Sequence, residues 1–142
     1  MTVAAIIEQD GRFLLVQERV DGKRVYNQPA GHLEDGESLL DAVVRETLEE
    51  TARDFSPASV TGIYRWRHPQ SQVTYMRVAF AGEVVSHRPD YVLDPDIEQT
   101  VWMDRNEIVQ RQDALRSPMV LHCIDDYLAG AACPLTLLAD IE

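Results

Sequence analysis

The sequence predicts a single α/β domain, in which helices cover the faces of a mixed β-sheet. Short β-prone apolar runs and helix-like stretches follow one another in the order strands, helix, strands, helices, which is typical of this class. The 142 residues fit one domain that can bury a sizeable core, and no repeat or linker divides them. The composition, with 45% hydrophobic and 26% charged residues, is that of an ordinary globular protein.

The first part of the chain is expected to form hairpins followed by a loop. The runs 3–7 and 13–16 are apolar and β-prone, and the Asp-Gly pair at 10–11 between them is a strong hairpin signal. A second Asp-Gly pair, at 21–22, is expected to turn the chain again before a further short strand. The segment 27–37 contains Pro, Gly and Asp and predicts a loop.

Three helices are expected. Ser38 is a favourable N-cap, with Asp41 three residues later, for a helix from Leu39 to about Thr51. A short helix should begin after Asp104, which has Glu107 at the capping-box position. Ser-Pro at 117–118 predicts the start of a last helix, which should end near residue 129, before a glycine.

Two longer strands should lie between the first two helices. Residues 60–67 and 72–85 are rich in β-branched and aromatic side chains, and the sequence HPQS between them suits a turn. The segment 86–98 is rich in Asp and Pro, which predicts a loop, and a short strand should follow around 101–102.

The charge balance argues against two classes of partner. The formal net charge of −11 argues against nonspecific binding to nucleic acid or to an anionic membrane. It leaves room for a phosphorylated small molecule, because a bound metal ion inverts the local field.

Cys123 and Cys133 have no metal-ligand spacing and are expected to be free thiols. No apolar run approaches the roughly 20 residues of a membrane span, and the first residues resemble a strand, so we expect a cytoplasmic protein.

The predicted first helix carries three carboxylates on one side. Glu46, Glu49 and Glu50 lie at helical spacings that place them on one arc, beside the apolar face. Like charges at this spacing destabilise a helix by roughly 0.2–0.5 kcal/mol per pair. Two interpretations remain open from this run alone: a solvated helix face, or a site for a hard cation such as Mg²⁺, which prefers oxygen ligands.

The wider stretch has a specific spacing. It reads G-x5-E-x7-R-E-x-x-E-E and comprises Gly31, Glu37, Arg45, Glu46, Glu49 and Glu50. This pattern resembles the Nudix box, the signature of the Nudix hydrolases. The resemblance implies a Nudix fold, an α/β/α sandwich around a mixed β-sheet, as one domain over residues 1–142 with the box at about 31–53.

Three positions depart from the box. Thr47 and Arg53 stand where the family has bulky apolar residues, and Ala52 stands where it has glycine. That glycine would suit a left-handed residue that ends the helix. With Ala52, either the helix ends differently or the residue bears a strain of about 1 kcal/mol. No expected metal ligand is lost.

The resemblance also implies the roles of the box residues. Glu46, Glu49 and Glu50, with the carbonyl of Gly31, would hold Mg²⁺, for which Mn²⁺ can substitute. These glutamates would thereby be catalytic, because the metal activates the attacking water. The base is a box glutamate or an acid on a later loop. The later-loop candidate is Glu98, in the sequence DPDIEQTVW, and the alternative is that it is a solvated loop acid.

The remaining candidates support the loop or contact the substrate. Glu37 and Arg45 should pair and orient the loop against the helix, rather than form an ordinary surface salt bridge. The expected lining of the substrate groove is Tyr26, Gln28, Trp66 and Arg77. An aromatic ring there would stack on a base, and the arginine would bind a phosphate oxygen. The alternatives are core packing for the two aromatic residues and a strand-surface charge for the arginine.

Two further motifs narrow the resemblance. YNQPAGHLE before the helix and LRSPMV near the C-terminus are similar to those of the NudJ-type branch of bacterial Nudix phosphatases. This implies hydrolysis of nucleoside tri- and diphosphates, or of a thiamine-pathway pyrophosphate such as hydroxymethylpyrimidine diphosphate, with release of orthophosphate. It also favours a monomer. The alternatives are another nucleoside-diphosphate derivative, such as a dinucleotide or a nucleotide sugar, and a catalytically silent nucleotide-binding domain.

Overall fold

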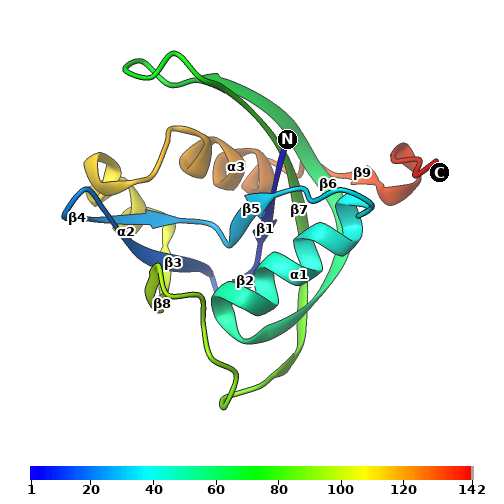
Figure 1. The fold of residues 1–142 in the computed structure, drawn as a ribbon, viewed down its shortest axis with the longest axis horizontal. Coiled ribbons are helices and arrows are strands. Elements are labelled where there is room, and N and C mark those ends of the chain that lie inside the picture. The colour runs from blue at the N-terminus through cyan, green and yellow to red at the C-terminus, as the bar shows by residue number, and fades with distance from the viewer. Residues whose placement is uncertain (142) are drawn as a thin grey trace.

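The computed structural model describes residues 1–141, which form two β-sheets and three α-helices (Figure 1). The first sheet has the strand order β5-β1-β7-β6-β9, and the second has β3 between β4 and β8, with β2 pairing to β3 as well. The strands of the first sheet are β1 (Thr2–Ile6), β5 (Ala30–His32), β6 (Arg53–Arg67), β7 (Thr74–His87) and β9 (Cys133–Pro134). Those of the second are β2 (Glu8–Gln9), β3 (Arg12–Val20), β4 (Lys23–Asn27) and β8 (Ile97–Asp104).

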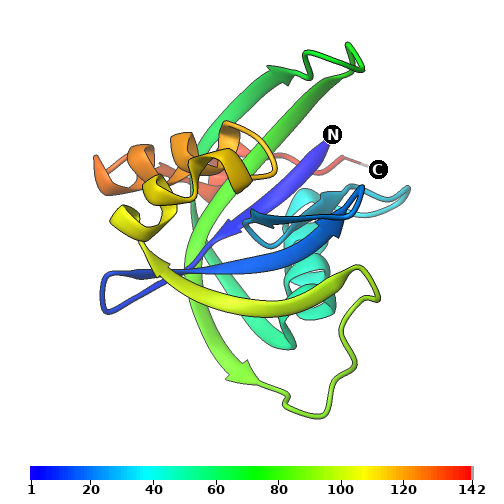
Figure 2. The same cartoon turned by 90° about the vertical axis from the view of Figure 1, so that its left-hand side faces the viewer.

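The first sheet is mixed, as predicted. Strand β1 runs parallel to β7 and antiparallel to β5, whereas β6 and β7 form a long antiparallel hairpin. That hairpin projects beyond the rest of the molecule (Figure 2). The helices are α1 (Leu39–Thr51), α2 (Arg105–Gln110) and α3 (Met119–Leu128), and two 3₁₀ turns lie at Gln112–Ala114 and Leu135–Leu137.

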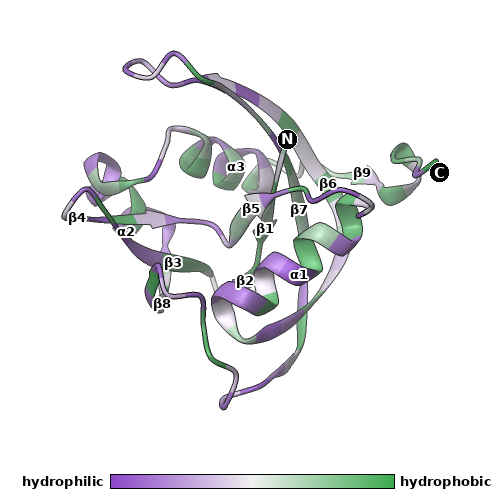
Figure 3. Cartoon of the chain, viewed as in Figure 1, coloured by the Kyte–Doolittle hydropathy of each residue, from purple (hydrophilic) through white to green (hydrophobic). Residues whose placement is uncertain are grey.

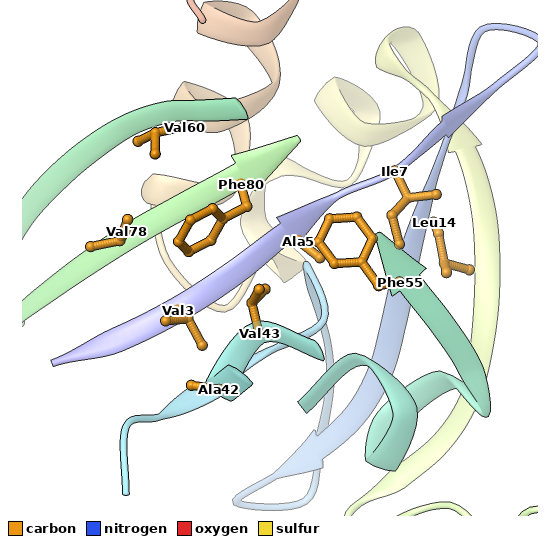
Figure 4. Packing of buried hydrophobic residues seen from close by; sticks show 10 residues of the cluster. All are labelled: Val3, Ala5, Ile7, Leu14, Ala42, Val43, Phe55, Val60, Val78 and Phe80. Atoms are coloured by element: carbon orange, nitrogen blue, oxygen red, sulfur yellow. The ribbon is translucent and has the colours of Figure 1, made fainter. Parts of the chain in front are cut away.

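Helices α1 and α3 cover opposite faces of this sheet, because side chains alternate along each strand. On β7, Val78 and Phe80 pack in one cluster with Val43 of α1 (Figure 4). Their neighbours Ala79 and Ala81 pack in a second cluster with residues of α3. The predicted α/β/α sandwich around a mixed sheet is therefore confirmed.

Helix α1 has the amphipathic character that the sequence predicted, with hydrophilic and hydrophobic residues alternating along it (Figure 3). It begins as expected, because the Asp41 amide donates to Ser38 Oγ at 3.1 Å. Thr47, at an apolar position of the box, is fully buried, and its hydroxyl donates to the Val43 carbonyl at 2.7 Å. This bond satisfies the hydroxyl, so the core tolerates threonine there.

The end of α1 keeps the geometry that glycine would give. Ala52 is left-handed, with φ 57° and ψ 27°, and its amide donates to the Leu48 carbonyl at 2.9 Å. The helix thus ends with a left-handed residue, and a non-glycine residue carries that conformation. The next residue, Arg53, lies over the ring of Trp102 at 5.8 Å, a cation–π contact that suits its non-apolar side chain.

Several boundaries differ from those predicted. Strand β6 begins at residue 53, directly after α1, and includes Pro57, where its pairing with β7 shifts register. Proline is tolerated at such irregular positions because one ladder hydrogen bond is already lost. Strand β5 lies within the predicted loop, and β8 begins at residue 97 because it pairs along most of β3. Among residues 1–141, no helix is both long and apolar enough to cross a membrane.

Candidate active site

The carboxylate face of α1 packs against β5, the short strand that contains the box glycine. Gly31 is needed here for space, because a Cβ atom at this position would overlap the carboxylate of Glu46. Its backbone does not lie in the left-handed region, so any residue could adopt the conformation. The absent side chain lets the Glu46 carboxylate lie directly against the strand backbone.

Two of the box glutamates are buried. Glu50 accepts a hydrogen bond from the Ala30 amide at 2.9 Å, and burial raises the pKa of Glu50 to about 9, although that hydrogen bond opposes the shift. Burial also raises the pKa of Glu46, and its hydrogen bond with Arg45 opposes this shift. Neighbouring carboxylates raise both pKa values further. The surroundings of both side chains therefore disfavour their ionised forms.

Arg45 connects the loop before α1 to the carboxylates on it. Its Nε lies 2.6 Å from Glu37 Oε2 and its Nη2 lies 3.0 Å from Glu37 Oε1, so the expected pair is present and has two hydrogen bonds. Nη1 donates to Glu46 at 2.9 Å and to Glu49 at 3.2 Å. Nη2 also donates to the His32 carbonyl at 3.1 Å. One guanidinium thus fixes carboxylates from both segments.

Asp94, an acid from the loop before β8, forms a cluster with Glu46 and Glu49. One carboxylate oxygen of each lies within 4.8 Å of those of the other two. The backbone brings Asp94 to this place, because its amide donates to the carbonyl of Glu49 at 3.0 Å. Asp94 was not among the residues predicted from the sequence, since a loop acid far along the chain has no spacing relation to the box.

Glu98, the candidate loop acid, is placed elsewhere. It lies on β8, where its carboxylate accepts hydrogen bonds from Gln17 at 3.2 Å and from Arg19 at 3.3 Å. Arg24 Nε lies 3.9 Å from Glu98 Oε1. The hydrogen bond from Gln17, followed by the charge of Arg19, lowers the pKa of Glu98. The structure therefore brings Asp94, and not Glu98, to the carboxylate cluster.

A cavity of about 590 Å³, here called the carboxylate cavity, is lined by Glu46 and Glu50 and also by Arg77. Arg77 is only 4% exposed. Its Nη1 donates to Gln28 Oε1 at 2.8 Å and its Nη2 to Asn27 Oδ1 at 3.0 Å, and both acceptors are neutral. Within residues 1–141, its Nε has no hydrogen-bond partner and its guanidinium forms no ion pair.

The other predicted substrate contacts separate into two kinds. Trp66 lines the carboxylate cavity and stacks on Tyr75, with ring centroids 6.0 Å apart and planes at 27°. Gln28 is 1% exposed and acts behind the cavity wall, where it holds Arg77 and donates to the Val120 carbonyl at 2.8 Å. Tyr26 is 9% exposed and packs in the core cluster beneath α3, as the alternative interpretation expected.

The residues present fit a divalent metal ion. The cluster offers hard carboxylate oxygens from three side chains, which is the donor type of Mg²⁺ and Mn²⁺. Glu50 adds a buried carboxylate, which lines the carboxylate cavity together with Glu46. Burial raises the pKa of Glu46 and of Glu50, and a cation beside them would favour their charged forms.

Comparisons with known proteins give matches over most or all of the chain. Residues 1–122 match the profile of the NUDIX domain. The chain is 37% identical to Phosphatase NudJ of Escherichia coli strain K12, over 142 residues that cover 100% of this chain and 92% of that protein. Phosphatase NudJ of Shigella flexneri matches with the same identity and coverage.

Solved structures show the same fold. A NUDIX hydrolase from Nitrosomonas europaea superposes with a TM-score of 0.96 at 48% sequence identity, over 99% of this chain and 95% of that chain. A MutT protein from Methanosarcina mazei Go1 superposes with a TM-score of 0.73 over 91% of this chain and 93% of that chain. Its sequence identity is 22%, so it supports the fold alone.

Proposed function

The chain belongs to the Nudix hydrolase family, and we propose that it is a Mg²⁺-dependent phosphohydrolase that releases orthophosphate from a small organic di- or triphosphate. One observation carries this proposal. A single cavity is lined both by the buried carboxylates of Glu46 and Glu50 and by the buried Arg77, whose guanidinium forms no ion pair within residues 1–141. A metal-bound phosphate chain is complementary to both, because the metal is positive and the phosphates are negative.

The metal ligands follow from the cluster. Glu46, Glu49 and Asp94 would hold the ion, with Glu50 and the carbonyl of Gly31 as further ligands. When bound, a divalent ion polarises the phosphoryl oxygens and lowers the pKa of a bound water. We propose a box glutamate or Asp94 as the acceptor of the water's proton, where the sequence left a box glutamate or Glu98 as the candidates.

Arg77 and Trp66 would bind the substrate. Two neutral amide oxygens hold the Arg77 guanidinium in place, and no carboxylate of residues 1–141 forms a direct ion pair with it, so a phosphate oxygen is a suitable partner. Trp66, backed by Tyr75, offers a ring face to a flat heterocycle. Nucleoside di- and triphosphates, and hydroxymethylpyrimidine diphosphate, combine these two features. The 37% identity to Phosphatase NudJ supports release of orthophosphate.

The test is phosphate release from nucleoside di- and triphosphates and from hydroxymethylpyrimidine diphosphate, with and without Mg²⁺. We compare the wild type with Glu50→Gln, which keeps an acceptor for the Ala30 amide but removes the charge. Glu83→Gln, an exposed change on β7, is the matched control. We expect Mg²⁺-dependent release that falls by orders of magnitude in Glu50→Gln only. Absence of release from every substrate by a folded wild type would contradict the proposal.

Two further parts of the proposal rest on the sequence. We propose a cytoplasmic location and a monomeric state, and the net charge of −11 argues against nonspecific binding to nucleic acid. Analytical ultracentrifugation tests the monomer.

A further inference from the structure

A second cavity of about 520 Å³ adjoins the carboxylate cavity. Four residues line both of them, namely Trp66, His68, Arg116 and Ser117. The second cavity lies between the end of the β6–β7 hairpin, which projects from the molecule (Figure 2), and the segment that leads into α3. A volume of this size falls in the range of about 300–1,000 Å³ that is typical of small-molecule sites.

The lining of the second cavity combines aromatic, aliphatic and polar side chains. Trp66 and His68 meet edge to face, with ring centroids 5.2 Å apart and planes at 62°. Leu115 and Leu121 supply aliphatic surface from the segment before α3 and from α3 itself. Gln112 adds an amide with hydrogen-bond donors and acceptors. This combination suits a flat ring that has hydrogen-bonding groups at its edge.

Arg116 stands where the two cavities meet, and the fold holds it there at two points. Its amide donates to the Tyr26 carbonyl at 2.8 Å, which ties the segment before α3 to β4. Its Nη1 donates to the buried Glu18 carboxylate at 2.6 Å. This is its one side-chain hydrogen bond within residues 1–141, and the side chain is 47% exposed, so other guanidinium N–H groups remain available to a ligand.

The two motifs outside the Nudix box thus meet at this junction. Tyr26, Asn27 and Gln28 belong to YNQPAGHLE, and Arg116 belongs to LRSPMV. The first motif holds Arg77, which lines the carboxylate cavity, and its Tyr26 carbonyl accepts the hydrogen bond from the Arg116 amide. Together they position two arginines that line the carboxylate cavity, of which Arg116 also lines the second cavity.

We propose that the second cavity is the subsite for the organic group of the substrate, a flat aromatic heterocycle, and that Arg116 binds the phosphate that links this group to the reacting phosphate. The proposal rests on the proposed function for the direction of the substrate. The reacting phosphate lies at the carboxylates, the chain passes Arg77 and Arg116, and the ring packs against Trp66 and Leu121. Gln112 and His68 offer hydrogen bonds to the ring edge.

The first test reads binding without catalysis. The 16.1 kDa chain suits amide-resolved NMR, and AMP, GMP, CMP and UMP have no phosphoanhydride to cleave. At millimolar nucleotide we expect concentration-dependent shifts at the amides of Gln112, Leu115 and Leu121, and none from orthophosphate at Gln112 or Leu121. Shifts confined to the carboxylate cavity, or no shifts at these amides with any nucleotide, would overturn the proposal.

The second test fills the cavity. Leu121→Trp places a large ring in it, and Leu128→Trp is the matched control, because Leu128 lies on the same helix, is 50% exposed and does not line the cavity. We expect Leu121→Trp to raise KM for a nucleoside diphosphate at least about tenfold with little change in kcat, which is a loss of binding shared by the ground and transition states. Gln112→Trp is a second, independent filling variant and should act in the same direction.

The outcomes separate the two proposals. An unchanged KM in both filling variants, with an active wild type, overturns the subsite and leaves the hydrolase proposal in place. Nucleotide shifts at the second cavity without hydrolysis of any substrate contradict the hydrolase proposal and leave a nucleotide site. Equal increases in KM for Leu121→Trp and Leu128→Trp would show that the effect is not local to the second cavity. That result would overturn the assignment of this cavity as the subsite.

Discussion

The amide of Asp94 donates a hydrogen bond to the carbonyl oxygen of Glu49, and the side chains of the same two residues offer oxygens to one carboxylate cluster. The last carbonyl groups of a helix have no partners within the helix. Here the loop between β7 and β8 supplies a donor to one of these carbonyl groups, that of Glu49. The Arg88 amide of the same loop donates to the Ala52 carbonyl at 2.8 Å. The same backbone hydrogen bond to Glu49 therefore caps the end of α1 and places Asp94 beside the box glutamates.

We expect Asp94→Asn to raise the Mg²⁺ concentration needed for half-maximal phosphate release by at least about tenfold, a size typical of groups that support a metal site. The change removes a charged oxygen from the cluster but leaves the backbone bond to Glu49 in place. Glu98→Gln is the comparison, because that carboxylate contacts Gln17 and Arg19 instead. A larger effect from Glu98→Gln would return the loop-acid role to it.

Gly31→Ala should disturb the metal response more than it disturbs folding. The new methyl group would overlap the Glu46 carboxylate, which must move away from the cluster. Overpacking of this kind costs about 1–3 kcal/mol of stability. Gly11→Ala is the control, since its left-handed glycine has open space around it and the strain there is about 1–2 kcal/mol without contact to the site. Urea unfolding and Mg²⁺ titration of activity, measured on both variants, separate the two effects.

Arg45→Lys should weaken Mg²⁺ activation by roughly 10–100-fold. The guanidinium makes two bonds to Glu37 while it also reaches Glu46, and a lysine ammonium cannot reproduce this planar geometry. Arg88→Lys breaks a comparable two-bond pair, with Asp54, that is exposed and outside the cluster. We expect Arg88→Lys to keep the wild-type response. Similar Mg²⁺ curves for Arg45→Lys and the wild type would exclude an orienting role for Arg45.

In the absence of metal, the stability of the protein should fall as the pH rises from about 5 to about 9. The pKa of Glu50 is about 9 in the folded protein against an ordinary 4.5, so the folded state binds more protons than the unfolded state over this range. The raised pKa of Glu46 acts in the same direction. Glu50→Gln should make the fall of the unfolding free energy with pH less steep. Denaturant unfolding at several pH values, in the presence of a chelator, measures this dependence. An unfolding free energy of the wild type that rises with pH over this range would refute the raised pKa of Glu50.

Ala52→Gly should change stability by no more than about 1 kcal/mol. Glycine relieves about 1–2 kcal/mol of left-handed strain. It also loses about 0.8 kcal/mol from a buried methyl group and about 0.4–1 kcal/mol through a more flexible unfolded chain. Ala52→Val should be clearly destabilising, because a β-branched residue is strongly disfavoured at positive φ. Thermal unfolding of both variants gives the comparison, and tolerance of valine would show that the helix end can rearrange.

Much of the fold followed from local sequence. The Asp-Gly pairs at 10–11 and 21–22 each lie at a turn between paired strands, and α1 has the predicted bounds of residues 39 and 51. Strand boundaries followed less well, because they depend on the partner strand. Strand β5 contains three residues that no local pattern marks as extended, and it forms because β1 and α1 lie beside it.

The sequence alone determined the carboxylate face of α1 and the glycine beside it, because a helix has a fixed period and the box has a fixed spacing. Only the tertiary structure decided which distant residues join them. Asp94 reaches the cluster through a backbone bond, whereas Glu98, four residues later, pairs with Gln17 and Arg19 across the second sheet. The physical reason is that the path of a loop and the register of a strand are set by the surfaces they pack against, and spacing along the chain does not contain that information.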